Sequence, residues 1–212
     1  MARIPITKEG YPFILISLVP VAAACIAGFK WLELIFVPIA AFVVNFFRDP
    51  ERDIPAGEDA IVSPADGRVI KVERVADERF TGADATRICI FMNVFNVHVN
   101  RAPASGRVVK IMYNPGKFFN ASYDKAALEN EQNCLVVETA KGRRLAFNQI
   151  AGLIARRIVC RVSTEDTLVK GERFGMIRFG SRVDVYLPVE CESVVRVGDK
   201  VKAGSSVIAR WV

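Results

Sequence analysis

The chain of 212 residues contains a single histidine, His98. Imidazole is the commonest protein ligand of transition metals, so a histidine-rich metal site is excluded. The five cysteines form no Cys-x-x-Cys pair and leave one over, which speaks against a zinc site and a disulfide framework. Four of the five lie in apolar or strand-like surroundings, where cysteine acts as a small hydrophobic residue. The five are Cys25, Cys89, Cys134, Cys160 and Cys191. We therefore expect no bound metal.

Two signatures of common functions are also absent. The chain has no Gly-x-Ser-x-Gly segment, so the serine elbow of the α/β-hydrolases is missing. It has no basic stripe interleaved with aromatic residues, and nucleic acid is not an expected partner. The formal net charge of +6 instead favours attraction to an anionic membrane, where each basic residue near the surface contributes about 1 kcal/mol.

Charge is nearly absent from the N-terminal quarter of the chain. Residues 13–29 contain no charged side chain, and residues 31–47 contain only Glu33. Both stretches have 17 residues, the lower limit for a helix that crosses a bilayer core. The pattern predicts a membrane-anchoring helical hairpin over residues 1–48, which either spans the bilayer or lies flat in its interface. A cleaved signal peptide is disfavoured, because the apolar length exceeds that of a signal core.

Basic residues flank this apolar region on both sides. Arg3 and Lys8 precede it, and Arg48 and Arg52 follow it. A hairpin returns both flanks to one side of the membrane, and basic flanks favour the cytoplasmic side. We therefore expect the second domain, residues 49–212, on the cytoplasmic face of the cell (inner) membrane.

After Pro55 the sequence changes to short alternating runs separated by Gly, Asp and Pro turns. Regular spacing of this kind is typical of an all-β sandwich or barrel. Residues 122–131, rich in Ala, Leu, Lys and Glu, predict one short helix. The predicted strands are Arg68–Val72, Arg87–Phe91, Arg107–Tyr113, Asn133–Thr139, Arg144–Ile150, Arg156–Val162, Val183–Leu187 and Val207–Val212.

The peptide between Gly180 and Ser181 is the most informative bond of the chain. Glycine has no Cβ, so this bond can bend and be approached closely. The Ser181 hydroxyl could then attack the Gly180 carbonyl, with the protein as its own substrate. The competing interpretation is an ordinary turn between two strands, since Gly and Ser are common turn residues.

Several separated segments resemble the phosphatidylserine decarboxylase proenzyme family, in particular its short-chain, archaetidylserine decarboxylase-like branch. The resemblance extends from about residue 46 to the end. It rests on the segment around Asp66 (Ser-Pro-Ala-Asp-Gly), the segment around His98 (Phe-Asn-Val-His-Val-Asn-Arg) and Phe179-Gly-Ser. Supporting segments are Phe46-Phe-Arg-Asp-Pro-Glu-Arg52, Tyr113-Asn-Pro-Gly-Lys-Phe-Phe-Asn-Ala121 and Ile150-Ala-Gly-Leu-Ile-Ala-Arg-Arg157.

The resemblance implies a mainly β fold, a lipoyl- or biotinyl-type hammerhead sandwich or barrel. It also implies cleavage of the Gly180–Ser181 bond into a β chain, residues 1–180, and an α chain, residues 181–212. Ser181 then becomes a covalent pyruvoyl cofactor, which forms a Schiff base with phosphatidylserine and yields phosphatidylethanolamine and CO2. The expected partner of the enzyme is phosphatidylserine in an anionic membrane. The β and α chains are expected to form a heterodimer with each other. Homo-oligomerisation stays open, as does a diacyl or a diether lipid.

The catalytic residues carried over with the resemblance are Ser181, His98 and Asp66. Histidine takes and returns protons near neutrality, so His98 is the expected base for cleavage and acid for decarboxylation. Asp66 would orient its imidazole. Longer family members have a second histidine where this chain has none. Either His98 therefore serves both steps, or the base for self-cleavage is another group.

The loop around Lys117, Phe118 and Phe119 is the expected substrate-binding segment. A Pro-Gly pair interrupts the chain there, and phenylalanine beside lysine suits acyl chains and phosphate. The two phenylalanines are equally compatible with the core.

Two other functions remain open on the residues alone. One is a membrane-anchored serine hydrolase that uses Ser181, His98 and Asp66 without cutting itself. The other is a non-enzymatic, lipoyl-like scaffold tethered to the membrane. Only self-cleavage predicts a fragment of residues 181–212 with a blocked N-terminus.

Overall fold

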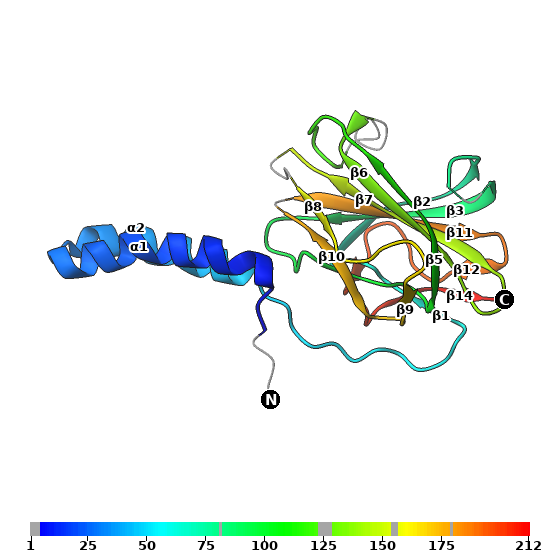
Figure 1. The fold of residues 1–212 in the computed structure, drawn as a ribbon, viewed down its shortest axis with the longest axis horizontal. Helices are drawn as coiled ribbons and strands as arrows, with labels where there is room; N and C mark the ends of the chain where they lie inside the picture. Colours follow the sequence, from blue (N-terminus) through cyan, green and yellow to red (C-terminus); the bar gives the residue numbers. More distant parts are fainter. Residues whose placement is uncertain (1–4, 81, 123–128, 154–156, 179) are drawn as a thin grey trace. The chain divides into compact units, whose positions relative to one another are not determined.

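The computed structural model describes residues 5–80, 82–122, 129–153, 157–178 and 180–212. The chain divides into two compact units, Met1–Glu51 and Arg52–Val212. The first is helical and the second is built of β-strands (Figure 1). A mainly β fold behind an N-terminal helical hairpin is thus confirmed.

The first unit is a hairpin of two apolar helices. A 3-10 turn, η1 (Lys8–Gly10), leads into α1 (Tyr11–Ala27), and α2 (Lys30–Phe46) follows after a short turn. Main-chain bonds close its open end, where Thr7 donates to the Phe47 carbonyl at 2.9 Å. Most of the large apolar side chains along both helices are exposed, among them Ile26 and Leu34. Exposed apolar helices of this kind need a non-aqueous surrounding.

One helical stretch among the described residues, Lys8–Ala27, is long and apolar enough to cross a membrane. This finding concerns length and composition alone, and both suit membrane association. The second helix, α2, has 17 residues and is shorter than that stretch.

The β unit is organised around a long antiparallel sheet that curls into an open half-barrel (Figure 1). Its strands in spatial order are β13 (Lys200–Val201), β2 (Gly67–Asp77), β3 (Ala83–Met92), β11 (Ser181–Pro188), β7 (Arg144–Ala151), β6 (Gln132–Glu138), β5 (Gly106–Asn114) and β9 (Thr167–Leu168). The strand β11 therefore lies between β3 and β7, in the interior of the sheet.

Two smaller antiparallel sheets complete the described part of the unit. In one, β10 (Arg173–Ile177) lies between β4 (Val99–Arg101) and β8 (Ile158–Cys160). In the other, β14 (Val207–Trp211) lies between β1 (Ala60–Val62) and β12 (Cys191–Ser193). Each predicted strand coincides with an observed one within a few residues. The predicted helix over residues 122–131 falls largely on residues outside those described.

The two faces of β11 have different surroundings, because successive side chains of a strand point to opposite faces. Val183, Val185 and Leu187 belong to the main hydrophobic core. Asp184 and Tyr186 lie on the other face, as the alternation predicts. Both are nevertheless buried, so this second face carries polar groups inside the protein.

Candidate active site

Three chain segments cross side by side from the long sheet to the sheet of β4, β10 and β8. In the long sheet Ser181 pairs with Met92 on one side and Ala151 on the other. In the small sheet Met176 lies between Val99 and Val159. The β10–β11 connection is therefore the middle one, flanked by the β3–β4 and the β7–β8 connections. The Gly180–Ser181 bond lies in this middle connection.

The middle connection is also the shortest. It comprises residues 178–180, whereas the flanking connections comprise residues 93–98 and 152–157. Gly180 has a φ of 68°, in the left-handed region that favours glycine. Its neighbour Phe179 lies outside the described residues.

The Gly180 carbonyl rests directly against Gly152 of the β7–β8 connection. A Cβ built at Gly152 would overlap the carbonyl oxygen and carbon of Gly180. The absence of a side chain at 152 thus makes room for the bond that Ser181 would attack. Sequence reasoning did not single out Gly152, because its importance depends on a partner 28 positions away in the chain.

Ser181 is fully buried at the first position of β11. Its Oγ lies 3.4 Å from Met92 Sδ on β3. Asn100 Nδ2 reaches the same sulfur at 3.9 Å, and Gln149 Nε2 donates to Asn100 Oδ1 at 2.9 Å. Ser181 thus occupies a buried place beside Met92, whose sulfur also contacts an amide side chain of the smaller sheet.

His98 lies at the end of the β3–β4 connection and is fully buried. Its carbonyl accepts a 3.3 Å hydrogen bond from the N–H of Ile177, next to the middle connection. Its Nδ1 lies 2.9 Å from the Asn96 carbonyl, which only accepts, so Nδ1 carries the proton. In the neutral ring Nε2 is therefore the basic nitrogen. The structure brings His98 and Ser181 into the same group of connections.

Asp66 is not the partner of the His98 ring. Its carboxylate accepts hydrogen bonds from Arg52 Nη2 at 2.8 and 3.1 Å and from the Ala203 N–H at 2.8 Å. In place of the expected contact with the His98 imidazole, the Asp66 carboxylate links Arg52, at the start of the β unit, to Ala203 in the β13–β14 turn. The acidic residue was predicted on motif alone, and the competing Arg52 lies 14 positions earlier in the chain.

The predicted substrate loop is tied to the same site. Asn130 holds it by accepting from the Phe119 N–H at 2.8 Å and donating to the Phe119 carbonyl at 2.8 Å and the Ala151 carbonyl at 2.7 Å. Phe118 packs partly against the main core. Lys117 forms an exposed ion pair with Glu129 at 3.0 Å. The loop therefore reaches Ala151, the strand neighbour of Ser181.

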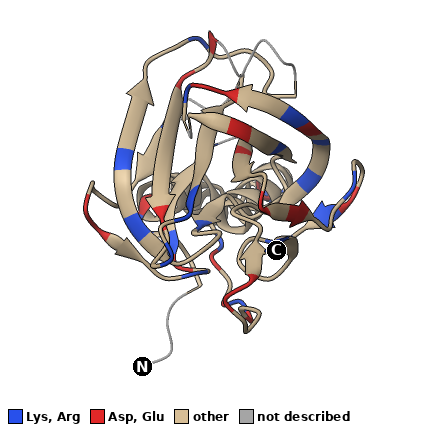
Figure 2. Cartoon of the chain, turned by 90° about the vertical axis from the view of Figure 1, so that its right-hand side faces the viewer, with Lys and Arg blue, Asp and Glu red and all other residues tan. Residues whose placement is uncertain are grey.

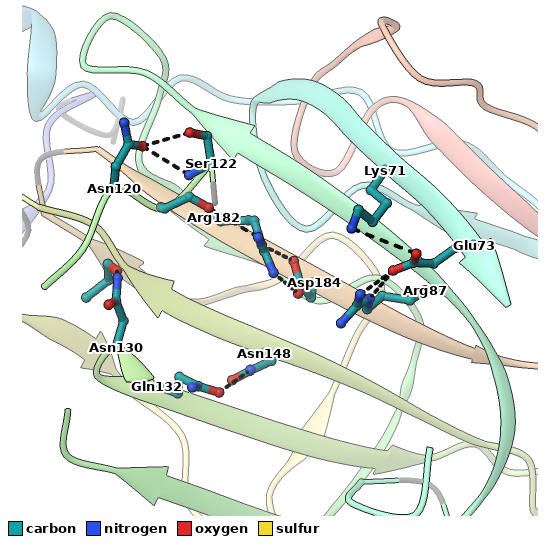
Figure 3. A network of polar contacts seen from close by, with 12 residues as sticks. Lys71, Glu73, Arg87, Asn120, Ser122, Asn130, Gln132, Asn148, Arg182 and Asp184 are labelled. Carbon is teal, nitrogen blue, oxygen red and sulfur yellow. Dashed lines mark hydrogen bonds and ion pairs between the residues drawn. The ribbon is translucent and has the colours of Figure 1, made fainter. Parts of the chain in front are cut away.

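A buried ion pair follows the Gly–Ser bond directly (Figure 3). Arg182 Nε and Nη2 each lie 2.7 Å from one oxygen of Asp184, and both side chains are buried. Arg182 Nη1 also donates to the Ala121 carbonyl at 3.2 Å, at the end of the substrate loop. This pair was missed from the sequence. The only available signal was an Arg-x-Asp spacing, which places both side chains on one face of a strand.

Three buried thiols of the β unit are kept protonated, and two of them, Cys89 and Cys134, feel the charge of Asp184. Burial raises the pKa of Cys89, and the Asp184 carboxylate raises it further. Burial likewise raises the pKa of Cys134, and that of Cys191 to about 12. Because the thiolate is the nucleophile, these cysteines do not compete with Ser181.

We expect Cys89, Cys134 and Cys191 to resist alkylation by iodoacetamide at pH 8 in the folded protein, since that pH lies below their raised pKa values. All three should react fully in denaturant. Partly exposed Cys160 serves as the internal control. Peptide mass spectrometry after a short pulse makes the measurement, and rapid labelling of Cys89 in the native state would contradict it.

The fold and the candidate site define a mainly β unit in which the buried Ser181 begins an interior strand and the Gly180 carbonyl lies against Gly152. The family model for phosphatidylserine decarboxylase matches residues 39–209 of the chain. The chain is 54% identical over 204 residues to the phosphatidylserine decarboxylase proenzyme of Oleidesulfovibrio alaskensis, covering 96% of this chain and 93% of the relative. The corresponding proenzyme of Nitratidesulfovibrio vulgaris is 53% identical, with 98% and 95% covered. That of Desulfotalea psychrophila is 48% identical, with 99% and 98% covered.

The chain belongs to the phosphatidylserine decarboxylase family.

Proposed function

We propose that this chain is a proenzyme that cleaves its own Gly180–Ser181 bond and then decarboxylates phosphatidylserine to phosphatidylethanolamine and CO2, a step of phospholipid biosynthesis. The observation that carries the proposal is the placement of this bond in the middle of three crossing connections, with Gly152 making room for its carbonyl. Membership of the family supplies the reaction and the substrate class.

The cleavage balances as follows. The Ser181 Oγ attacks the Gly180 carbonyl, and the amide becomes an ester as the nitrogen leaves. Loss of the Ser181 α-proton expels the Gly180 carboxylate and leaves a dehydroalanine. Addition of one water then releases ammonia and leaves a pyruvoyl group at position 181. The sum is one water consumed, one ammonia released and two chains formed.

The residues around position 181 fit such a group. The site is buried, so a small ketone end would be shielded from bulk water. Such a group would supply a carbonyl that condenses with the substrate amine, with loss of water, and the resulting C=N bond would serve as the sink for the electron pair released with CO2. Ser181 begins β11, whose main chain is hydrogen-bonded to β3 and β7, and Arg182 adds its bond to the Ala121 carbonyl. These contacts would hold the new chain end in place after the cut.

The two chains would stay together for the same reason. Residues 181–212 supply β11 to the interior of the long sheet and β14 to the middle of a small sheet. The strand β11 bonds on both sides to strands of residues 1–180, and β14 bonds on one side to such a strand, β1. We propose a non-covalent heterodimer of β and α chains with the β unit on the cytoplasmic face of the cell membrane. Basic residues on both flanks of the apolar hairpin support this placement.

His98 would handle the protons of the reaction. Its Nδ1 bond to the Asn96 carbonyl fixes the ring and leaves Nε2 to take or give a proton. A catalytic role for Asp66 stays a prediction. Its observed bonds to Arg52 and Ala203 support a role in holding the fold around the site.

The test of the proposal is the intact mass of the purified protein. We expect two chains that co-purify without denaturant, with masses for residues 1–180 and for residues 181–212 carrying a pyruvoyl end. A hydroxylamine-type carbonyl probe should label only the small chain. Lipid extracts of cells that lack the protein should accumulate phosphatidylserine. A single unlabelled chain that still turns over substrate would disprove the mechanism.

We expect His98→Asn to lose turnover by a factor of about 10² to 10⁴, the usual contribution of general acid–base catalysis. The asparagine amide preserves a donor for the Asn96 carbonyl but takes no proton. Turnover is measured on the fraction that has already been cut, so the effect is separate from maturation. An active His98→Asn enzyme would remove His98 as the proton donor.

A further inference from the structure

Few of the exposed hydrophobic residues of the β unit are larger than valine. Among the described residues 52–212, those larger than valine are Phe95, Tyr113 and Leu153, at 67, 58 and 64% exposure. The remaining ones are all valines: Val169, Val189, Val194, Val197 and Val212. The bulky apolar side chains therefore call for a specific explanation.

Two of the three bulky residues lie in the connections that flank the Gly180–Ser181 bond, and hydrogen bonds through Glu131 link the third to Ala151. Phe95 is in the β3–β4 connection and Leu153 in the β7–β8 connection, on either side of the middle connection. The Tyr113 hydroxyl bonds to Glu131 Oε1 at 3.1 Å, and the Glu131 carbonyl accepts from the Ala151 N–H at 3.0 Å. We call Phe95, Tyr113 and Leu153 the apolar rim.

The three connections around the Gly180–Ser181 bond carry a net positive charge in their sequence. In sequence, residues 93–98, 152–157 and 178–180 contain three arginines, Arg156, Arg157 and Arg178, and no acidic residue. The Arg178 N–H donates to the Arg157 carbonyl at 3.3 Å, so two of these residues are neighbours. The side of the β unit seen in Figure 2 differs, because Lys and Arg alternate there with Asp and Glu.

We propose that the apolar rim is a membrane-docking surface of the β unit, which seats the connections around the Gly180–Ser181 bond on an anionic phospholipid bilayer. Exposed aromatic and leucine side chains enter the boundary between headgroups and acyl chains, and the exposed Arg157 meets anionic phosphate and carboxylate groups. This contact is distinct from the helical hairpin: the hairpin keeps the chain at the membrane, and the rim turns the site toward it. The proposal rests on the function given above for its purpose, but its first test needs no activity.

The first test measures depth in the bilayer. In a full-length Trp31→Phe background, Phe95→Trp is compared with Val189→Trp in vesicles of phosphatidylserine and brominated phosphatidylcholine. Val189 is 61% exposed just beyond the far end of β11, about 25 Å along the strand from Ser181. We expect bromine to quench residue 95 and not residue 189, after subtraction of the parent signal from Trp211. Equal quenching at both positions, or none at 95, would overturn the proposal.

The second test separates docking from chemistry. We expect Phe95→Asp and Leu153→Asp to raise the apparent KM for phosphatidylserine in vesicles about tenfold. KM for a short-chain, monomeric phosphatidylserine and the extent of self-cleavage should not change, and Val189→Asp should behave as the parent. An equal loss on the monomeric substrate would show that the residues act inside the site, and docking would be rejected. Absence of all turnover with normal quenching would instead refute the proposed function and leave the docking surface standing.

Discussion

Ser181→Ala is expected to give one uncut chain of 212 residues with no measurable decarboxylase activity. The variant lacks the hydroxyl that attacks the Gly180 carbonyl and the oxygen that leaves when the chain is cut. Its fold should be kept, because among the described residues the Ser181 side chain has one polar contact, at 3.4 Å to Met92 Sδ. Denaturing electrophoresis, intact mass and thermal unfolding check the three parts of the expectation.

The chain provides a matched control for this variant. Gly204–Ser205 is a second Gly–Ser peptide, and its glycine is also left-handed, with a φ of 76° against 68° at Gly180. Ser205 is partly exposed and lies in the turn between β13 and β14, whereas Ser181 is buried at the start of an interior strand. Ser205→Ala should therefore be cut and active as the parent. Cleavage in Ser181→Ala, or a loss of cleavage in Ser205→Ala, would refute the assignment of the bond.

Gly152→Ala is expected to slow self-cleavage about 10- to 100-fold, the change that 1–3 kcal/mol of overpacking produces in a rate. The new methyl group would overlap the Gly180 carbonyl and push it from its place. The rate is followed by the appearance of the 181–212 fragment after synthesis in a cell-free system. The fraction of the variant that has been cut should turn over substrate at part of the parental rate. In that fraction Gly180 is a free chain end, and its carbonyl can move away from the new methyl group.

Gly142→Ala is the control for a general loss of stability. No heavy atom lies within 4 Å of a Cβ at Gly142, yet its φ of 73° makes an alanine there costly by about 1–2 kcal/mol. We expect this variant to melt at a lower temperature and to be cut at the parental rate. Equal cleavage rates in the Gly152 and Gly142 variants would exclude a specific role for Gly152.

The strands and the helical hairpin could be predicted from the sequence because their signals are local. The alternation of apolar and polar residues along β11 predicts that Val183 and Val185 face the core, as observed. The two stretches with almost no charge predict the helical hairpin. The Gly180–Ser181 bond could be named, but not distinguished on its own from Gly204–Ser205. The two bonds differ in the sheet that surrounds them. A short sequence segment around a Gly–Ser pair does not determine which strands become its neighbours.

The remaining site residues depend on contacts between distant segments. Gly152 gains its meaning from Gly180, and Asp66 takes Arg52 and Ala203 as partners in place of His98. Arg182 and Asp184 are neighbours on one strand, yet their burial depends on chain segments that cover the second face of the sheet. Such pairings follow from register and topology, which a single sequence does not determine.

The position of β11 inside the long sheet has a consequence for the lifetime of the enzyme. A cofactor bound from solution can be exchanged when it is damaged, but this one would be the end of an interior strand, bonded to β3 and β7 on both sides. Replacing it would require unravelling the sheet. Each polypeptide would thus mature once, and a chemically spoiled ketone could be renewed only by synthesis of a new protein.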